Sequence, residues 1–511
     1  MPTRRHEVTQ HLNQPHRNLV ALLAVLAALS CGNVASAQPP PGFVDASTFG
    51  GGFNPTDATS ALQAAIDSGS DVWVPNLGTD WNVTPIELTQ SNQTILLEEG
   101  VVVAAKPGAF LNGSDNLIRN VTKQNVRLEG YGATLRMRQQ DYLSAPYTPT
   151  QFRFAVGLYG PNGMEIVGLT IENAGGDGIY LGANGAASSQ NILIQDVVID
   201  NAYRNGISII HADNVTIDNV VIANTSGNAP QAGIDFEPNT TTQGIENVVI
   251  RDSIIVGNFS EGIIWSLRDD AALIPPVTGT VENVTVIGNG GHGLEMLEGA
   301  LPSTTIKDSL IIDNFRAGFS VGSDCNAQVY DCAVIHEIEH SAFWGNVEGV
   351  LDGEAGLGTG SITGAQPNFV SQFVSTDLHH PYFMYLEPDT PTAITLGASD
   401  GGYMGARPVL WTGDMDGDGS VTNDDVQWFI QALVDPAAYA ANGFTTPSGQ
   451  LIDGAVNGDI NRDGIFDTGD VGAWNTIFSG LVVSVAVPEP SSILCLGVAV
   501  AILASRRQRC R

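Results

Sequence analysis

Basic residues are scarce in this chain: 21 Lys and Arg stand against 54 Asp and Glu among 511 residues, giving a formal net charge of −33. So acidic a surface repels phosphate backbones and anionic lipid, and we expect no nucleic-acid binding. Cysteine is rare too, with five residues, which excludes a disulfide framework. Cys325 and Cys332 alone lie outside the two end segments, where an oxidising compartment would allow them to pair. Glycine, by contrast, is abundant, with 58 residues, which indicates many tight turns.

The N-terminal segment has the features of an export signal. A basic stretch precedes an apolar run at residues 19–29, and residues 35–37 (Ala-Ser-Ala) form a small-residue cleavage site. We therefore interpret residues 1–37 as a secretory signal peptide. Lipid attachment at Cys31 is the weaker alternative, because the large aliphatic residue expected three positions earlier is absent.

The C-terminal end combines a Val-Pro-Glu-Pro sequence at 487–490, a mostly apolar stretch at 491–504 and a cluster of Arg. Such an apolar helix would span about 21 Å, which is short for a permanent bilayer crossing, and the Arg cluster would fix its far end in the cytoplasm. Residues 486–511 closely resemble the PEP-CTERM sorting signal; an ordinary tail anchor is the alternative. The resemblance implies an exosortase-type sorting enzyme as partner and transient anchoring in the inner membrane. On either interpretation the body is secreted or displayed at the cell surface.

A repeat runs from residue 162 to residue 350. Each copy has an alternating apolar strand, an Asn and a short strand opened by Gly, and the Gly-led strands recur every 25–31 residues. This pattern predicts one coil of a β-solenoid per repeat, since propeller blades would repeat at about 40–50 residues. Stacking would place equivalent residues about 4.8 Å apart. The Asn residues are then expected to form one ladder; they are Asn173, Asn201, Asn224, Asn258, Asn289 and Asn314.

The segment before the repeats predicts a cap for the first coil. Asp57 is a candidate N-cap, and apolar residues at 58, 61, 62, 65 and 66 form one face of an amphipathic helix. This helix, the strand at 72–75 and the Gly-Gly-Asp-Gly-Ile-Tyr sequence at 175–180 resemble pectate lyase-like right-handed parallel β-helices. The resemblance implies an all-β solenoid over residues 38–405, with residues 367–407 as its last, irregular coils. It leaves the activity open, because that superfamily includes lyases, hydrolases, epimerases and non-enzymes.

Aligning the Gly-led strands places polar residues in two rows, one just before the Gly and one two residues after it. The residue between them points inward, so both rows are expected near the outer face. Charged residues from about five coils would then line roughly 20 Å of one side, which suits an extended sugar chain. The candidate catalytic residues are Asp177, Arg204, Asp235, Glu237, His292 and Glu295, and Glu261 lies in the same rows.

Two mechanisms fit these residue types. Carboxylates on neighbouring coils can act as acid and base in glycoside hydrolysis. Alternatively, acidic residues hold Ca²⁺ against a uronate carboxylate while Arg204 or His292 abstracts the α-proton in a β-elimination. A scaffold with merely solvated polar residues is the non-catalytic alternative. The HExxH sequence at 336–340 is not expected to bind zinc, because a strand would hold its two His about 13 Å apart.

Two acidic loops near the C-terminus share a 12-residue frame typical of Ca²⁺ sites, and each leads into an apolar helix. The candidate Ca²⁺ ligands are Asp414, Asp416, Asp418, Ser420 (carbonyl) and Asp425 in the first loop, and Asp459, Asn461, Asp463, Ile465 (carbonyl), Asp467 and Asp470 in the second. Residues 411–480 resemble a dockerin, a small α-helical pair of EF-hand-like units, although an insertion at about 436–458 separates the loops. The resemblance implies bound Ca²⁺ and a cohesin-like partner.

The sequence thus predicts a secreted or surface-sorted, polysaccharide-active β-helix, either a lyase or a glycoside hydrolase, with a calcium-binding docking module. The alternative is a non-catalytic surface or matrix protein whose solenoid binds glycans or serves as a scaffold. No superfamily catalytic signature is complete in the chain, and this keeps the alternative open.

Overall fold

The computed structural model describes residues 38–474, apart from 267–276, 298–302, 323–335, 354, 371–377, 380–382, 419, 423 and 446–450. The expected signal peptide, the Cys325–Cys332 pair and the PEP-CTERM tail fall outside the described residues. None of the helices that the structure does describe is both long and apolar enough to cross a bilayer.

The Gly-led strands stack in one ten-stranded sheet, in which every pairing is parallel. Its strands are β4 (Ile86–Leu88), β7 (Ile118–Val121), β9 (Val156–Tyr159), β11 (Ile179–Gly182), β14 (Ile207–Ile209), β17 (Ile234–Phe236), β20 (Ile263–Trp265), β23 (Leu294–Met296), β26 (Phe319–Val321) and β29 (Leu351–Gly353). Each strand pairs with its equivalent in the next coil, so the expected register is confirmed.

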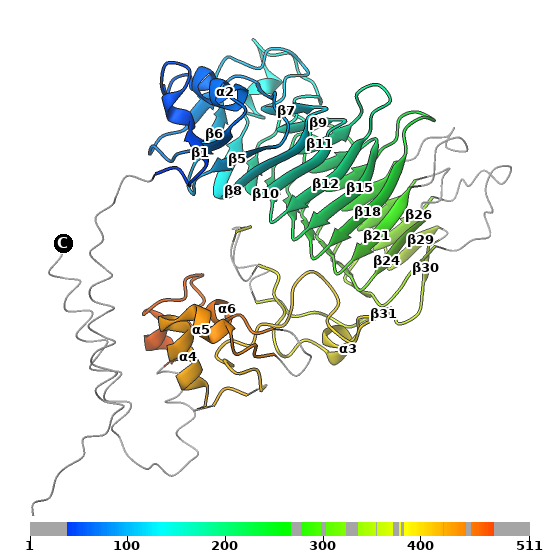
Figure 1. The fold of residues 1–511 in the computed structure, drawn as a ribbon. Helices are drawn as coiled ribbons and strands as arrows, with labels where there is room; N and C mark the ends of the chain where they lie inside the picture. Colours follow the sequence, from blue (N-terminus) through cyan, green and yellow to red (C-terminus); the bar gives the residue numbers. More distant parts are fainter. Residues whose placement is uncertain are drawn as a thin grey trace, which may run out of the picture. The chain divides into compact units, whose positions relative to one another are not determined.

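The other faces of the coils form a 19-stranded sheet, whose strands run side by side in Figure 1. Its strands are β1 (Phe43–Asp45), β2 (Asp71–Val74), β3 (Trp81–Val83), β5 (Gln93–Leu97), β6 (Val102–Ala105), β8 (Gln124–Arg136), β10 (Asn162–Glu172), β12 (Ser189–Gln195), β13 (Val198–Asp200), β15 (Ala212–Asp218), β16 (Val221–Ala223), β18 (Ile245–Arg251), β19 (Ile254–Val256), β21 (Thr278–Glu282), β22 (Thr285–Ile287), β24 (Ser303–Lys307), β25 (Leu310–Ile312), β28 (Ala342–Trp344) and β31 (Ile362–Thr363). A two-stranded sheet pairs β27 (His336–Ile338) with β30 (Ala355–Leu357). Because β27 is a strand, residues 336–340 lack the helix that a zinc-binding HExxH motif requires.

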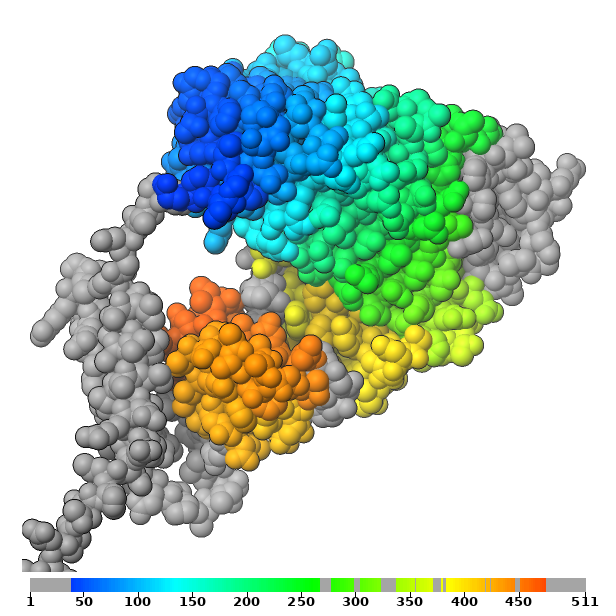
Figure 2. Space-filling view, in the orientation of Figure 1, coloured from blue at the N-terminus to red at the C-terminus, as the bar shows by residue number. Residues whose placement is uncertain are grey.

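The core consists of columns of apolar side chains, one from each coil. The residue after the strand-opening Gly is buried in every coil from Ile179 to Phe319. Figure 2 shows the sequence colours changing gradually along the stack, as expected when each coil contacts mainly its neighbours. The Gly residues themselves permit this approach: a Cβ at Gly262 would lie 2.3 Å from a methyl of Val286 and 2.5 Å from the Gly293 carbonyl oxygen.

The Asn series forms two adjacent columns instead of one ladder. Asn173, Asn201 and Asn224 are left-handed corner residues, and Gly257 and Gly288 take that corner in later coils. The later Asn residues lie one position further along the chain. There Asn258 Nδ2 donates to Asn289 Oδ1 (3.0 Å), Asn289 Nδ2 to Asn314 Oδ1 (2.9 Å) and Asn314 Nδ2 to Asn346 Oδ1 (2.9 Å). The prediction of a single ladder was wrong because Asn and Gly both accept a positive φ, so that one column changes residue type partway along.

The cap helix is α2 (Thr59–Asp67), and it buries Ala61, Leu62, Ala65 and Ile66 as expected. Asp57 lies one residue before the N-cap position, and its Oδ1 accepts a hydrogen bond from the Thr59 amide (3.1 Å). The short 3₁₀ helices are η1 (Ala46–Thr48) and η2 (Asp141–Leu143).

Beyond β31 the chain does not continue as the expected irregular coils. Phe383, Met384 and Ala406 pack instead against Val221, Ile254, Ile287 and Ile312 on the outer face of the 19-stranded sheet. This closing segment, residues 378–410, includes α3 (Thr392–Thr395).

The acidic module contains α4 (Asp425–Val434), α5 (Pro436–Ala440) and α6 (Gly454–Gly458). Met415, Phe429, Ala432, Tyr439 and Trp474 form its buried core. The apolar helix expected after the second loop is described only as far as Trp474.

Candidate functional site

The outer face of the ten-stranded sheet holds the residues that the alignment singled out. The row two residues after the Gly runs in register through Tyr180, Ser208, Asp235, Ile264, Glu295, Ser320 and Asp352. Within this face the candidate residues form two groups, one around Arg204 and one around His292.

Three carboxylates surround Arg204: Asp177 comes from the preceding coil, and Asp235 and Glu237 come from the following coil. Arg204 Nη1 lies 3.4 Å from Asp177 Oδ2, while Nη2 lies 2.5 Å from Glu237 Oε2 and 3.6 Å from Asp235 Oδ2. Asn205 braces this group: its Nδ2 donates to Asp235 Oδ2 (3.0 Å) and its backbone amide to Asp177 Oδ1 (3.2 Å). We call these residues, Asp177, Arg204, Asp235 and Glu237, the arginine cluster.

Burial differs sharply within the arginine cluster. The side chains of Asp177 and Asp235 are wholly buried, that of Arg204 is 8% exposed and that of Glu237 is 19% exposed. The expected register of the rows is confirmed by the strand pairing, but two of the acids lie beneath other groups. Only Arg204 and Glu237 can meet a ligand directly.

The ionisation of the arginine cluster follows from having one cation for three acids. Burial raises the pKa of Asp177 to about 6 and that of Asp235 to about 7, although Arg204 opposes both shifts. Burial alone would lower the pKa of Arg204, but the carboxylates of Asp177, Glu237 and Asp235 outweigh it and raise that pKa above its usual value. The guanidinium therefore stays protonated, and the buried acids carry part of their protons near neutral pH.

A pocket of about 210 Å³ opens beside the arginine cluster. It is lined by Gln151, Phe152, Phe154, Tyr180, Arg204, Ile210, Glu237 and Asn239. The rings of Phe154 and Tyr180 stack with centroids 4.4 Å apart and planes 7° apart. The pocket thus combines an aromatic wall, formed by Phe152, Phe154 and Tyr180, with one accessible carboxylate. This arrangement suits the apolar face and hydroxyl groups of a sugar.

Sequence reasoning missed most of the aromatic wall. Phe152 and Phe154 come from the segment that leads into β9, which lies outside the repeat and has no equivalent in other coils. Only the exposure of Phe152, at 52%, marks this segment as unusual, and this is a property of the fold.

His292, Glu295 and Glu261 form the second group, two strands further along. His292 is 1% exposed; its Nδ1 accepts from the Ala317 amide (3.2 Å), and its Nε2 lies 3.7 Å from Glu295 Oε1. Burial, and then Arg316, lower the pKa of His292, so the imidazole is neutral at pH 7. Burial, and then Glu261, raise the pKa of Glu295 to about 7. Two strand spacings separate Glu295 from Asp235 in the row, or about 10 Å.

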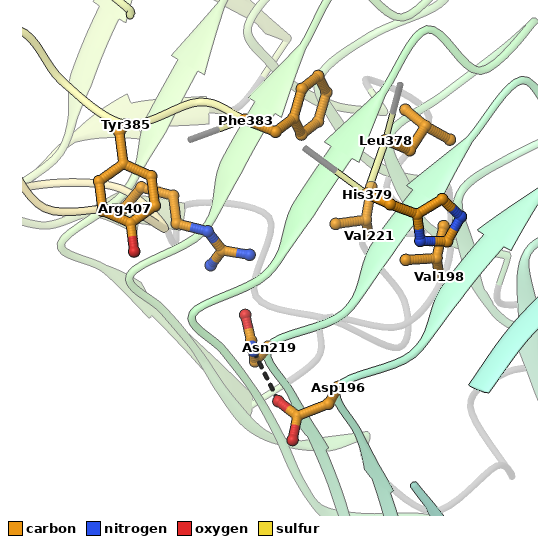
Figure 3. Close-up of a pocket in the computed structure, with 9 residues that line it drawn as sticks. All are labelled: Asp196, Val198, Asn219, Val221, Leu378, His379, Phe383, Tyr385 and Arg407. Atoms are coloured by element: carbon orange, nitrogen blue, oxygen red, sulfur yellow. Dashed lines mark hydrogen bonds between the residues drawn. The ribbon is translucent and has the colours of Figure 1, made fainter. Parts of the chain in front are cut away.

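A second pocket, of about 280 Å³, lies on the other side of the coils, between the 19-stranded sheet and the closing segment (Figure 3). Its lining contains none of the candidate catalytic residues; it comprises Asp196, Val198, Asn219, Val221, Leu378, His379, Phe383, Tyr385 and Arg407. Arg407 Nη1 donates to the carbonyl oxygens of Asp252 (2.7 Å) and Ala406 (3.0 Å). We interpret Arg407 as an anchor that ties the closing segment to the sheet.

The two acidic loops have matching local geometry. In the first loop Asp425 Oδ1 accepts from the amides of Met415 (2.6 Å) and Asp416 (3.2 Å), and Oδ2 accepts from the Thr422 amide (2.7 Å). Its counterpart Asp470 accepts from the amides of Asn461 (3.1 Å) and Asp467 (2.9 Å). The loops are therefore closed by the same contacts.

Carboxylate oxygens converge in the first loop. One oxygen from each of Asp414, Asp416 and Asp418 lies within 4.8 Å of the others. In the second loop Asn461 Nδ2 donates to Asp463 Oδ2 (2.9 Å), while Asp459 Oδ2 accepts from the Gly464 amide (2.7 Å). Grouped hard oxygens of this kind fit Ca²⁺.

Two family models match parts of the chain. Residues 86–274 and 154–334 match the family model described as "Right handed beta helix region". Residues 486–509 match the PEP-CTERM protein-sorting motif. The chain is thus a right-handed parallel β-helix that carries a PEP-CTERM motif. A curated relative, the uncharacterized protein YclG of Bacillus subtilis (strain 168), is 27% identical over 155 residues; the alignment covers 28% of this chain and 26% of YclG, about a quarter of that protein's length.

Solved structures to which the chain is similar have low sequence identity to it. An exopolygalacturonase from Thermotoga maritima is 13% identical, with a TM-score of 0.36, and the match covers 67% of this chain and 96% of that one. A family GH82 iota-carrageenase from A. fortis is 15% identical, with a TM-score of 0.41, covering 52% and 62%. The tailspike protein of E. coli bacteriophage HK620 is 15% identical, with a TM-score of 0.41, covering 59% and 57%.

Proposed function

We propose that this protein acts on a polysaccharide that binds along the outer face of the ten-stranded sheet. The observation that carries the proposal is the pocket where the arginine cluster meets the aromatic wall. A sugar ring can contact the exposed ring of Phe152 and the half-buried ring of Tyr180, which Phe154 supports from below, while its hydroxyl groups reach Glu237 and Arg204. The in-register rows extend this surface over several coils, as an elongated polymer requires.

Of the two mechanisms, the site supports hydrolysis better than β-elimination. A lyase base must accept a proton, whereas the carboxylates around Arg204 hold its guanidinium protonated, and His292 is almost completely buried. We propose Glu237 as the base or nucleophile, because it is the most accessible acid of the arginine cluster. Glu295, whose pKa of about 7 keeps it partly protonated at neutral pH, is the candidate acid.

The proposed hydrolysis needs one proton donor and one proton acceptor. Glu295 gives a proton to the glycosidic oxygen as the bond to the anomeric carbon breaks. Glu237 removes a proton from the attacking water, so that one reducing end and one alcohol form for each bond cleaved. Glu237 lies two strand spacings from Glu295 along the axis and two residues beyond its register position, so roughly 12 Å separates their backbones. This spacing excludes the about 5–5.5 Å of a retaining pair more readily than the about 6.5–9.5 Å of an inverting pair, which the side chains would reach by converging.

The test is an activity screen with a matched pair of variants. The full chain is incubated with neutral and uronate-containing polysaccharides, with and without Ca²⁺, and assayed for reducing ends and for the absorbance of unsaturated products. Glu237→Gln should lower hydrolysis at least about 100-fold, as loss of a general base does. Glu246→Gln, on an exposed residue of β18, should leave it unchanged. Unsaturated products would refute hydrolysis.

A non-catalytic glycan-binding protein is the second candidate. It is favoured by the complete burial of Asp177 and Asp235, since an arginine cluster of this kind can also serve to hold neighbouring coils together. Binding to a polysaccharide without any product in the same screen would support this candidate.

We further propose that the acidic loops bind Ca²⁺ and form a dockerin-like module with a cohesin-like partner. The matching closure of both loops and the convergence of Asp414, Asp416 and Asp418 support the Ca²⁺ sites. The PEP-CTERM motif supports export, transient membrane anchoring through residues 486–511 and processing by an exosortase-type enzyme. Deleting those residues should release the protein into the medium.

A further inference from the structure

A column of side chains in the turn before the ten-stranded sheet carries an aromatic residue in every second coil. Backbone hydrogen bonds establish which residues of neighbouring coils are equivalent. The amide of each column residue donates to a carbonyl in the preceding coil, and the residue that follows this carbonyl is its equivalent. The amides of Ser226, Phe259, Gly290, Phe315 and Val347 donate in this way to the carbonyls of Ala202, Thr225, Asn258, Asn289 and Asn314, at 3.0, 2.9, 2.8, 2.8 and 3.0 Å. The column therefore runs Tyr203, Ser226, Phe259, Gly290, Phe315 and Val347. We call Tyr203, Phe259 and Phe315 the aromatic column.

Members of the aromatic column occupy the same place in their coils. Each lies four residues before the first residue of its strand: Tyr203 before β14, Phe259 before β20 and Phe315 before β26. Successive members are two coils apart, which corresponds to about 10 Å along the solenoid axis.

Phe259 and Phe315 are 65% and 64% exposed, whereas the core columns are fully buried, so these rings add little to the stability of the fold. The gap between them is fixed by the backbone. A Cβ at Gly290 would lie 2.2 Å from the carbonyl oxygen of Phe259, so that no side chain fits there. Two exposed rings thus flank a permanent space.

The aromatic column runs beside both groups of candidate site residues. Arg204 follows Tyr203 directly, and Glu261 stands two residues after Phe259. Arg316, which follows Phe315, pairs with Glu348 (3.2 Å). Together with Glu348 and Arg316, the two groups contain six acids, Asp177, Asp235, Glu237, Glu261, Glu295 and Glu348, and two arginines, Arg204 and Arg316. Acidic groups therefore outnumber basic ones beside the column, and a polyanion would be repelled.

We propose that the aromatic column binds an uncharged, extended glycan that lies parallel to the solenoid axis and presents an equivalent ring face at every second sugar. A twofold, β-linked chain has this property, because alternate rings face the same way. Sugar rings would stack on Phe259 and Phe315 while the ring between them passes over Gly290. This inference rests on the proposed function and adds to it the class and the orientation of the polymer.

Binding measurements on the full chain test the proposal. The probes are hydroxyethylcellulose, glucomannan and xylan as neutral β-linked polymers, and alginate as the polyanion, in affinity gel electrophoresis. Oligosaccharides of two, four and six sugars from the best polymer are then titrated by calorimetry. Phe259→Ala and Phe315→Ala should each weaken binding of the hexasaccharide about tenfold, as expected for one ring that loses its stacking partner. Leu111→Ala, at a 54% exposed residue outside the column, should not.

The outcomes separate the two proposals. If the unmodified chain binds no glycan and cleaves none, the proposed function fails, and this inference with it. If it binds a glycan but both Phe variants bind equally well, only this inference is overturned. Tighter binding of alginate than of the neutral polymers would overturn the polymer class. Dissociation of a dimer by either Phe variant, seen by light scattering, would show that the rings contact a second copy and would overturn it too.

Discussion

Replacing Asp235 by Asn should change how the stability of the β-helix depends on pH. The pKa of Asp235 is raised to about 7 from a usual 3.8, mainly by burial. The folded chain then binds this proton more tightly than the unfolded chain, so the stability that Asp235 contributes is fully present below about pH 4 and is lost as pH rises to about 7. From pH 5 to pH 8 the loss attributable to Asp235 is about 3 kcal/mol, since one pKa unit corresponds to about 1.4 kcal/mol.

The Asp235→Asn variant isolates this contribution from general repulsion, which also weakens an acidic protein as pH rises. Asn keeps the size of the side chain and remains neutral. However, Ser266 Oγ donates to Oδ1 of Asp235 and Asn205 Nδ2 to Oδ2, and Asn has an acceptor oxygen at only one of these two positions. That loss lowers stability about equally at both pH values, by about 1 kcal/mol. The difference between variant and wild type should therefore shift by about 3 kcal/mol in favour of the variant between pH 5 and pH 8.

The assay is urea unfolding at pH 5, 6, 7 and 8 with constant Ca²⁺, followed by β-sheet circular dichroism. Trp265 offers a local fluorescence reporter, since its ring stacks on that of Phe236, next to Asp235, with centroids 5.1 Å apart. Glu246→Gln serves as control because the residue is exposed. If the free energy of unfolding changes with pH in the same way for Asp235→Asn and the wild type, burial of the Asp235 carboxyl does not control this pH dependence, and the explanation is refuted.

Two further predictions concern stability. Gly262→Ala should destabilise the β-helix by about 1–3 kcal/mol in the same urea assay, because the added Cβ would overlap Val286 and the Gly293 carbonyl. An unchanged midpoint of urea unfolding would mean that neighbouring coils can move apart to admit the methyl group at little cost. Chelation of Ca²⁺ should unfold the acidic module before the β-helix, and Asp414→Asn should weaken Ca²⁺ binding measured by calorimetry, whereas Asp424→Asn, at an exposed neighbour, should not. Identical melting with and without chelator would contradict the calcium proposal.

Much of the fold could be predicted from the sequence because the coil repeats its physical requirements. Each coil needs an inward apolar residue after a Gly that permits close contact, and this pair recurs from Gly178-Ile179 to Gly318-Phe319. The register of the polar rows followed from the same pair. The corner residues were harder to predict from the sequence. Asn224 and Gly257 occupy the same corner with the same left-handed backbone conformation, although they are different residue types.

The candidate site could be predicted only in part. Alignment of the strands identified Asp177, Arg204, Asp235 and Glu237, which the fold brings together around one guanidinium. It did not reveal how deeply Asp177 and Asp235 are buried. The direction of a side chain follows from the strand period, whereas its burial depends on which neighbouring segments pack over it. The aromatic wall was missed for the same reason: Phe152 and Phe154 belong to a segment without a repeat. The path of the closing segment could not be predicted either, because it depends on a tertiary contact in which Phe383 and Met384 pack on the 19-stranded sheet.

Placing helix α2 over the first coil has a consequence for the behaviour of many copies in solution. A stack of parallel strands offers unpaired amides and carbonyls at its end, a template on which another chain could add its own strands. Contacts of α2 with β2, β3 and β4 obstruct such growth at the N-terminal end. The helix therefore keeps copies of the chain from adding end to end into a fibre. Polymerisation is the first effect that we expect from its loss.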